Sequence, residues 1–291
     1  MKKSAFSLLE LSVSLVVVSL LMAMVSQGIK MVASSRLTTA RSLTSKSPVP
    51  TIPGLIAWYE TTSVDSLKAG EAVDGKQIST WYDISPDSIP ARKNTLTRTA
   101  SVAVIYKSDG INKIPSVYFN GSGRIALTDF HQGYTSQNTV FFVARAHNFT
   151  GQSGHVIDSG HTDVDGSQVC VIALIPTGIH LWSSMYIGST GYAAATNCCR
   201  VNADYIVAAY LNGSLSKSYV NTASTMTGNT TVNPGTIPLK GITVGADRNN
   251  AFNLTGLVSE VIVYNRILQL QERKDVMGYL SKKYGIVVTD L

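Results

Sequence analysis

Charged side chains are scarce in this chain, and they are not clustered. Asp, Glu, Lys and Arg make up 14% of the 291 residues, against 44% for hydrophobic residues, which is a low share for a soluble globular protein. The formal net charge of +6 includes Lys2 and Lys3, and the remaining cations form no dense basic face. Because binding to a phosphate backbone needs grouped cations, the sequence disfavours a nucleic-acid partner.

Cysteine is scarce as well. Cys170, Cys198 and Cys199 allow one intrachain disulfide at most, and no CxxC pair or Cys/His spacing indicates a structural zinc. If the body of the protein is exported, Cys170 with Cys198 or Cys199 is the candidate bridge. Three buried thiols are the alternative, and the sequence leaves both open.

One long hydrophobic run stands at the N-terminal end. Residues 11–29 contain no charged side chain, and a helix of about 20 residues is enough to cross the hydrocarbon core of a bilayer. Lys2 and Lys3 precede the run, which by the positive-inside rule keeps the N-terminus in the cytoplasm and places the body outside it. A removable secretory signal is the alternative, but this run is longer than a usual signal core and has no small-x-small cleavage site after it.

A carboxylate interrupts the beginning of this run. Glu10 lies four residues after Phe6, and a carboxylate in lipid is costly unless it has a specific partner. Lys2, Lys3, Ala5, Phe6 and the following SLLE resemble the leader junction of type IV prepilins and type II secretion pseudopilins. The resemblance implies that a prepilin peptidase cuts between Ala5 and Phe6 and methylates the new Phe6 amine.

In that family Glu10 would be the fifth residue of the mature chain. Its carboxylate would pair with a positive amine in lipid, within or between subunits. The sequence departs from the family in having Ala5 where Gly is usual, which bears on the efficiency of cleavage. The resemblance implies other pilin or pseudopilin subunits as partners, after residence in the bacterial inner membrane.

The segments that follow predict a stalk and a linker. Residues 31–47 lack Pro and Gly, so the helix is expected to run over residues 6–47. Three prolines then fall within residues 48–53 and predict a stiff, extended, non-helical connector. The expected organisation is a leader at 1–5, a membrane and assembly helix at 6–47, the linker at 48–53 and a head at 54–291.

The head reads as mainly β. Short runs rich in β-branched and aromatic residues alternate with Gly, Asn, Asp, Ser and Pro, which predicts an antiparallel sandwich. We expect about a dozen strands, near residues 54–60, 78–83, 115–119, 124–127, 139–146, 155–159, 168–175, 178–184, 205–213, 217–221, 241–246 and 257–265. One closing helix is expected at LQERKDVMGYLSKKYG.

Several of these segments resemble one family of folds. GLIAWYE, ISTWYDIS, IPSVYFNGSG, LTGLVSEVIVYNRIL and ERKDVMGYLSKKYGI are similar to the laminin G-like, concanavalin A-like jelly-roll domains of bacterial surface proteins. The resemblance implies two packed antiparallel sheets with a short helix at the end. The fold hosts lectins, glycanases and structural modules, so it says little about function.

Motifs for catalysis are absent from the sequence. Glycanases of this fold carry Glu-x-Asp-x-x-Glu on one strand, since retaining hydrolysis needs two carboxylates about 5 to 5.5 Å apart. Glu60, Glu71, Glu260 and Glu272 each stand alone, and no GxSxG nucleophile elbow occurs. We therefore predict that the protein is not an enzyme. The sequence does not decide whether Glu260 faces outward or is buried and held by Arg266.

The stretch DSGHTDVDGSQ is the most site-like part of the head. Asp158, Asp163 and Asp165 supply hard oxygen ligands within eight residues, and Ca²⁺ prefers such ligands. The EF-hand pattern is absent, so a solvated hairpin turn is the alternative to a calcium site.

Together these observations predict a pilin-like filament subunit, a minor pilin or pseudopilin, that displays a jelly-roll head. By analogy of fold, the head is expected to bind carbohydrate or a surface polymer. The alternative is a membrane-anchored periplasmic or surface jelly-roll module, or a glycan-active enzyme, that enters no filament.

Overall fold

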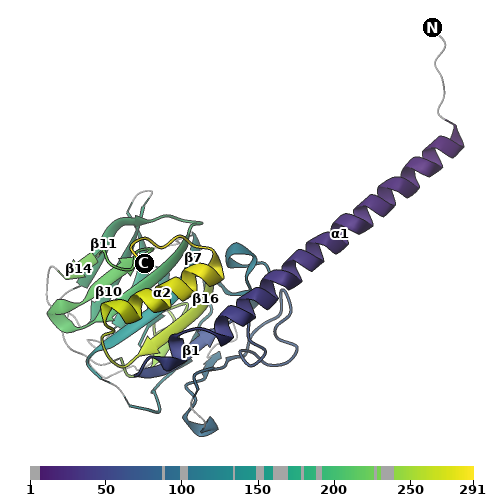
Figure 1. The fold of residues 1–291 in the computed structure, drawn as a ribbon. Helices are drawn as coiled ribbons and strands as arrows, with labels where there is room; N and C mark the ends of the chain where they lie inside the picture. Colours follow the sequence, from purple (N-terminus) through teal and green to yellow (C-terminus); the bar gives the residue numbers. More distant parts are fainter. Residues whose placement is uncertain are drawn as a thin grey trace.

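The computed structural model describes residues 7–86, 89–98, 104–133, 135–148, 154–159, 170–177, 180–187, 192–225, 228–230 and 239–291. It shows a β-rich head from which one long helix projects (Figure 1). The fold is the antiparallel jelly-roll sandwich that the sequence predicts, with a long N-terminal helix and a short C-terminal one.

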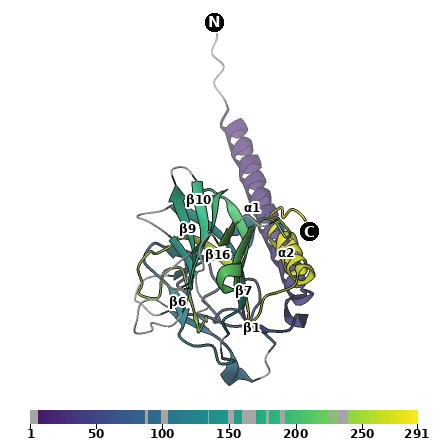
Figure 2. The ribbon, with the colours of Figure 1, turned by 90° about the vertical axis from the view of Figure 1, so that its left-hand side faces the viewer.

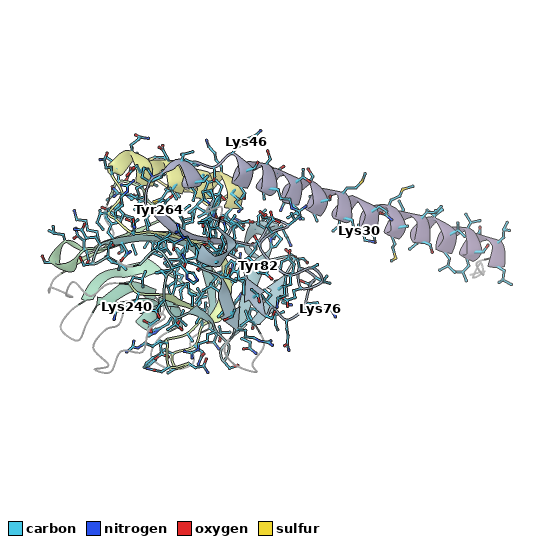
Figure 3. The ribbon with its side chains drawn as sticks, turned by 90° about the horizontal axis from the view of Figure 1, so that it is seen from below. Lys30, Lys46, Lys76, Tyr82, Lys240 and Tyr264 are labelled. Atoms are coloured by element: carbon cyan, nitrogen blue, oxygen red, sulfur yellow. The ribbon has the colours of Figure 1, made fainter. Side chains whose placement is uncertain are left out.

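Helix α1 (Leu8–Ser45) is continuous over 38 residues. It begins with a capping box, in which Ser7 Oγ accepts from the Glu10 backbone N–H and Glu10 Oε2 accepts from the Ser7 N–H. It ends shortly before Pro48, because a proline disfavours helical geometry in the residue before it. Figures 1 and 3 show that the N-terminal part of α1, which carries Lys30, stands clear of the head, whereas the C-terminal part lies along it.

The proline-rich segment is not the extended connector that we predicted. Val49–Thr51 form a 3₁₀ turn, since Pro48 adopts φ −72° and ψ −13°, values within reach of the fixed proline ring. The Thr51 N–H donates to the Pro48 carbonyl at 3.0 Å, and Val49 and Ile52 are buried. The segment therefore packs against the head and bends the chain directly into the first strand.

The described strands form one hydrogen-bonded path that runs from β2 to β4, with β1 paired to β16, and every pairing is antiparallel. Four of them, β3, β4, β11 and β14, were not predicted. The bounds are β1 (Leu55–Glu60), β2 (Thr80–Trp81), β3 (Leu96–Arg98), β4 (Val104–Lys107), β5 (Ser116–Asn120), β6 (Ile125–Leu127), β7 (Asn138–Asn148), β8 (Gly154–Asp158), β9 (Cys170–Thr177), β10 (His180–Ile187), β11 (Tyr192–Cys199), β12 (Asp204–Leu211), β13 (Lys217–Val220), β14 (Gly228–Thr230), β15 (Ile242–Val244) and β16 (Thr255–Tyr264).

The layer built on β7, β12 and β16 is buried on both faces. Along β7, Val140 and Phe142 belong to the core between the two layers of the sandwich, whereas Phe141 and Val143 belong to a second core. This second core lies beneath the two helices, which cover the same side of the sheet (Figure 2). Alternation along a strand sends side chains to opposite faces, so one strand serves both cores.

Helix α2 (Leu270–Tyr284) closes the second core. A capping box between Gln269 and Glu272 begins it, and Gly285 ends it in the left-handed conformation, with φ +62°. Val276, Met277 and Leu280 are fully buried. Because α2 also contacts α1, the long helix and the sheet meet through it.

Candidate functional site

Two carboxylates meet where β1 and β16 pair. The antiparallel register places Glu60 directly opposite Glu260, although 200 residues separate them in the sequence. Both side chains are fully buried. Like charges opposite each other in a sheet are destabilising, so this pair needs a cation.

Lys283 of α2 supplies that cation. Its Nζ donates to Glu60 Oε2 at 2.9 Å, to Glu260 Oε2 at 2.8 Å and to the Tyr279 hydroxyl at 3.1 Å. The three N–H groups of the ammonium thus all have acceptors. The side chains of Lys283 and of both glutamates have no exposed surface, so the cation is held entirely by the protein. We refer to Glu60, Glu260 and Lys283 as the buried charge cluster.

Further donors satisfy the rest of each carboxylate. Thr62 donates to Glu60 Oε2 through its N–H at 2.7 Å and its hydroxyl at 2.5 Å. Glu260 accepts from three aromatic side chains: Trp58 Nε1 at 2.7 Å, Tyr279 Oη at 2.8 Å and Tyr284 Oη at 2.9 Å. A buried charge is tolerated when its lone pairs are satisfied in this way.

The electrostatics keep the cluster charged. Burial raises the pKa of Glu60, but the Lys283 ammonium and the hydrogen bonds from Thr62 outweigh burial, and the net pKa is lowered. Burial lowers the pKa of Lys283, but Glu260 and Glu60 outweigh it, and that pKa lies well above its ordinary value. Glu60 therefore stays ionised and Lys283 stays protonated across the neutral range.

The long helix docks onto the head next to this cluster. Ala40 and Thr44 are buried in the interface, and Thr44 Oγ1 lies 3.3 Å from the Tyr279 hydroxyl, which itself donates to Glu260. Arg41 Nε donates to the Thr62 carbonyl at 2.7 Å. These contacts connect α1 to both carboxylates through one intermediate residue each, so the cluster fixes how α1 leaves the head.

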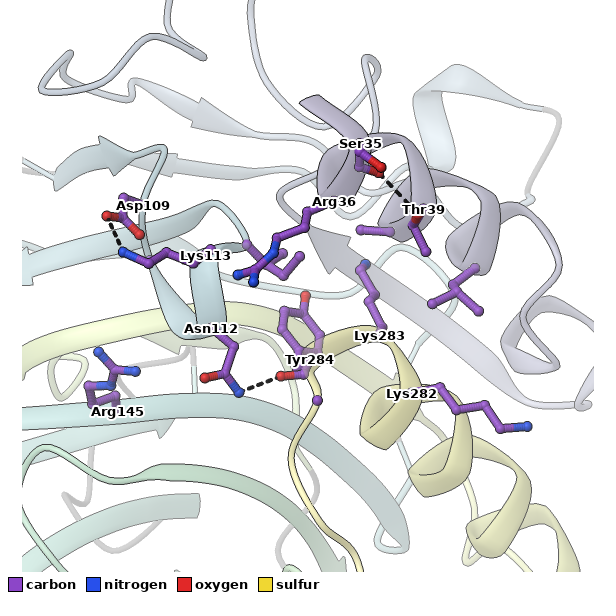
Figure 4. Close-up of a pocket in the computed structure, with 15 residues that line it drawn as sticks. Ser35, Arg36, Thr39, Asp109, Asn112, Lys113, Arg145, Lys282, Lys283 and Tyr284 are labelled. Carbon is purple, nitrogen blue, oxygen red and sulfur yellow. Dashed lines mark hydrogen bonds and ion pairs between the residues drawn. The ribbon is translucent and has the colours of Figure 1, made fainter. Parts of the chain in front are cut away.

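A groove of about 810 Å³ opens beside the docked helix. It is lined by α1 residues such as Arg36, by the loop that carries Asn112 and Lys113, and by the end of α2 (Figure 4). Asn112 Nδ2 donates to the Tyr284 carbonyl at 2.6 Å and closes the floor. The groove is polar where it meets the head, because Asp109, Asn112, Lys113 and Arg145 line it there.

The residues predicted at the leader junction lie on either side of the first described residue, Ser7. Glu10 lies in the first turn of α1 and completes the capping box with Ser7, a role that any exposed helix start can use. Ala5 and Phe6 lie outside the described residues. Cleavage between them and pairing of Glu10 with an amine stay predictions.

Of the three predicted calcium ligands, Asp158 alone lies within the described residues. Asp158 is fully buried and accepts from the backbone N–H groups of Ser159 at 2.7 Å and Arg248 at 2.9 Å. Burial raises its pKa to about 7, against those hydrogen bonds and the Arg248 charge. Asp163 and Asp165 lie outside the described residues. No cluster of three or more His, Cys, Asp or Glu side chains in the described part of the chain could hold a metal ion.

The strand register separates the predicted disulfide partners. Cys170 lies opposite Ile187 at one end of β10, whereas Cys199 lies opposite Leu181 near the other end. Six residues along a strand span about 20 Å, and a disulfide needs Cα atoms within about 7 Å. The backbone therefore does not bring Cys170 to Cys199 or to the adjacent Cys198.

The question left open for Glu260 is answered by α2. Glu260 is buried and held by Lys283, whereas Arg266 forms a bidentate pair with Glu272 at 2.5 and 2.9 Å. Reasoning from the sequence missed Glu60, Lys283 and the docking residues of α1. One signal was present: Glu260 interrupts an apolar strand, and an unpaired acid is rare at such a position.

Comparisons with known proteins give similar folds only. No protein-family profile and no curated protein matches the sequence. Domain 4 of AbnA, an extracellular GH43 arabinanase of Geobacillus stearothermophilus, in complex with arabinotriose, is 16% identical over 77% of this chain and 98% of its own, with a TM-score of 0.49. Trypanosoma rangeli sialidase in complex with sialic acid is 16% identical over 79% of this chain, with a TM-score of 0.47. The binding domain of Paraclostridial Mosquitocidal Protein 1 is 14% identical over 79%, with a TM-score of 0.48. This chain covers 33% of the sialidase and 52% of the mosquitocidal chain.

The similar structures include a domain of an arabinanase and a sialidase. The prediction that the protein is not an enzyme does not stand, because the reasoning behind it fails on geometry. It took Glu60 and Glu260 as isolated acids, but both carboxylates lie within 2.9 Å of one ammonium nitrogen. The absence of a one-strand acid motif therefore does not exclude catalysis.

Proposed function

We propose that the chain is a membrane-anchored jelly-roll module whose head is held at a fixed angle to the bilayer. One observation carries this proposal: α1 has two halves with opposite surroundings. Its apolar stretch is exposed over its whole length and is the one helix among the described residues that is long and apolar enough to cross a membrane. Its last turns are docked to the head through Arg41, Ala40 and Thr44.

The orientation follows from charge. Lys2 and Lys3 precede the apolar stretch, and cations flanking a span stay in the cytoplasm. The head would then face the periplasm or the cell surface. For its ligand we propose a glycan, the class of the arabinotriose and sialic acid named with two of the similar structures.

Fractionation of the full chain expressed in a bacterial host tests the anchor. We expect it to stay in the membrane pellet after carbonate extraction, with a C-terminal epitope accessible from outside spheroplasts. A soluble product that begins beyond residue 29 would show that the apolar stretch is a removed signal sequence, and the proposal would fail. Screening the purified chain against arabinan and sialylated glycans, for both binding and product release, tests the head.

A filament subunit of the pilin type is the second candidate. The leader-like order of Ala5, Phe6 and Glu10 supports it, together with a helix whose exposed apolar half could pack against copies of itself once it leaves lipid. N-terminal sequencing in strains with and without prepilin peptidase distinguishes the candidates. A chain that begins at methylated Phe6 only when the peptidase is present supports the filament, and a chain that begins at Met1 in both strains leaves the plain anchor.

A further inference from the structure

Two grooves meet where α1 leaves the head. The first is the polar groove of about 810 Å³ described above. The second, of about 570 Å³, has an apolar wall made by one stripe of α1. Arg36, Asp109 and Lys113 line both grooves, so the two adjoin at these residues. We refer to the adjoining pair as the channel, which has an apolar end and a polar end. The apolar stripe consists of Val25, Gly28, Ile29, Val32 and Ala33.

The polarity of this channel follows the expected position of a bilayer. Val25 and Ile29 belong to the last turns of the apolar run at 11–29, and Arg36 lies about 10 Å beyond Ile29 at 1.5 Å per residue. The headgroup layer occupies roughly the outer 5–7 Å of each leaflet. The apolar end therefore lies at the level of acyl chains and the polar end at or just above the phosphates.

Cations at the polar end are available to a ligand. Arg36 and Lys282 make no side-chain hydrogen bond or ion pair to any described residue, and Arg36 is exposed. Lys113 pairs only with Asp109, at 2.9 Å, with both side chains more than 60% exposed, and such a pair contributes little. Arg145 is different, because Asp204 binds it at 2.6 and 2.8 Å.

The apolar end of the channel is open to its surroundings. Gly28 is exposed, and a Cβ there would meet no heavy atom within 4 Å. Asn112 and Lys113 both adopt positive φ, +48° and +66°, which is costly for residues with side chains. The hydrogen bond from Asn112 Nδ2 to the Tyr284 carbonyl helps to hold the loop that carries both residues. Lys113 therefore lies on the side of the groove opposite Arg36 (Figure 4).

We propose that the channel binds one anionic phospholipid of the leaflet on the side of the head. Its phosphate lies between Arg36 and Lys113, and its glycerol and upper acyl chain lie on the stripe from Val25 to Val32. The inference rests on the proposed membrane anchoring. A second copy of α1 fits less well, because at the same level it would bring its own Lys30 and Arg36 against these cations.

Lipid retention by the full chain in nanodiscs tests this inference. The protein is placed in discs of phosphatidylcholine mixed with phosphatidylglycerol and extracted in mild detergent, and the ratio of the two retained lipids is measured by mass spectrometry. We expect enrichment of phosphatidylglycerol. Arg36→Gln/Lys113→Gln should lower the enrichment at least about fivefold, the factor that corresponds to about 1 kcal/mol for a cation near a lipid surface.

A matched control removes the same charge elsewhere. Lys46→Gln/Lys217→Gln should keep the wild-type ratio. Lys46 lies ten residues beyond Arg36, at the C-cap of α1, and Lys217 lies opposite Tyr210, at the other end of β12 from Asp204.

Four results would overturn the inference. The first is equal loss of enrichment in both double variants. The second is displacement of the lipid by soluble glycerol phosphate, which indicates a site for a free phosphate. The third is a change of oligomeric state in Arg36→Gln/Lys113→Gln with an unchanged lipid ratio, which indicates a second copy as the occupant. The fourth is wild-type protein that stays in the discs without enrichment. Protein that does not enter the discs at all instead refutes the anchoring on which the inference depends.

Discussion

At the residue scale, Lys283 pairs with two buried carboxylates, those of Glu60 and Glu260. Replacing it by methionine, which keeps the chain length, leaves Glu60 and Glu260 buried without their cation. Removing one partner of a buried ion pair costs roughly 3–5 kcal/mol. We expect Lys283→Met to lower the free energy of unfolding by about that amount in urea titrations followed by tryptophan fluorescence.

Lys282 provides the matched control for this substitution. It is the preceding residue of the same helix and forms no side-chain ion pair with a described residue. Lys282→Met should change the free energy of unfolding by less than about 0.5 kcal/mol, as surface substitutions usually do. Equal losses in the two variants would mean that the buried charge cluster stabilises nothing beyond the packing of the lysine side chain.

Asp158 makes stability depend on pH in an unusual direction. Burial raises its pKa to about 7 in the folded protein, against about 4 in an unfolded chain. Between these values the folded state binds more protons than the unfolded state, so the contribution of Asp158 is present below pH 4 and is lost as the pH rises to 7. Relative to Asp158→Asn, the wild type should lose stability across this window in unfolding measured at a series of pH values.

His155 acts in the opposite direction and must be separated from Asp158. Burial lowers its pKa to about 4, so its contribution is lost as the pH falls from 6.5 toward 4. Comparing Asp158→Asn with wild type at each pH cancels the His155 contribution. A flat difference between the two proteins from pH 4 to pH 7 would contradict the assignment to Asp158.

At the scale of elements, the docking of α1 depends on a small side chain. Ala40 is 1% exposed in the core beneath the helices, and added bulk in a packed interface costs about 1–3 kcal/mol. Ala40→Leu should therefore release the last turns of α1, seen as faster amide exchange over residues 35–46. Ser42→Leu adds similar bulk at an exposed position and should leave exchange unchanged, so parallel behaviour of the two variants would count against docking through Ala40.

The elements themselves were largely predictable, because they follow local patterns. The helix expected at 6–47 is observed at Leu8–Ser45, and the closing helix is observed at Leu270–Tyr284. β11 and β14 were missed because Ala, Asn and Gly dominate them, and their pairing with neighbours decides the conformation rather than β-propensity. The prediction of an extended linker was wrong because three prolines are also compatible with a 3₁₀ turn when Val49 is buried.

At the scale of the whole molecule, anchoring should depend on the apolar character of α1 alone. Val17→Arg/Leu20→Arg places two cations near the centre of the run at 11–29, at a cost of about 2.5–3.5 kcal/mol each. We expect the share of protein that resists carbonate extraction to fall steeply, whereas Thr38→Arg/Ser42→Arg, beyond the run, should keep it. If both variants stayed in the membrane pellet, the head rather than the helix would be responsible for membrane binding.

The site was much less predictable than the fold, because tertiary register creates it. Nothing local relates Glu60 to Glu260, and their meeting requires β1 to pair with β16 in one register. A slip of one residue would have sent Glu60 to the opposite face of the sheet. The leader motif is the reverse case: it is read directly from Ala5, Phe6 and Glu10, and the fold neither adds to it nor removes it.

The docking of α1 also determines how the molecule would respond to tension. If a ligand is held by the head while the cell moves, the pull is transmitted along the axis of α1. The contacts of Ala40, Arg41 and Thr44 lie on the side of that axis, so they are loaded together, in shear, rather than opened one after another. The buried charge cluster behind them resists the same displacement, and the helix and head should yield as one mechanical unit.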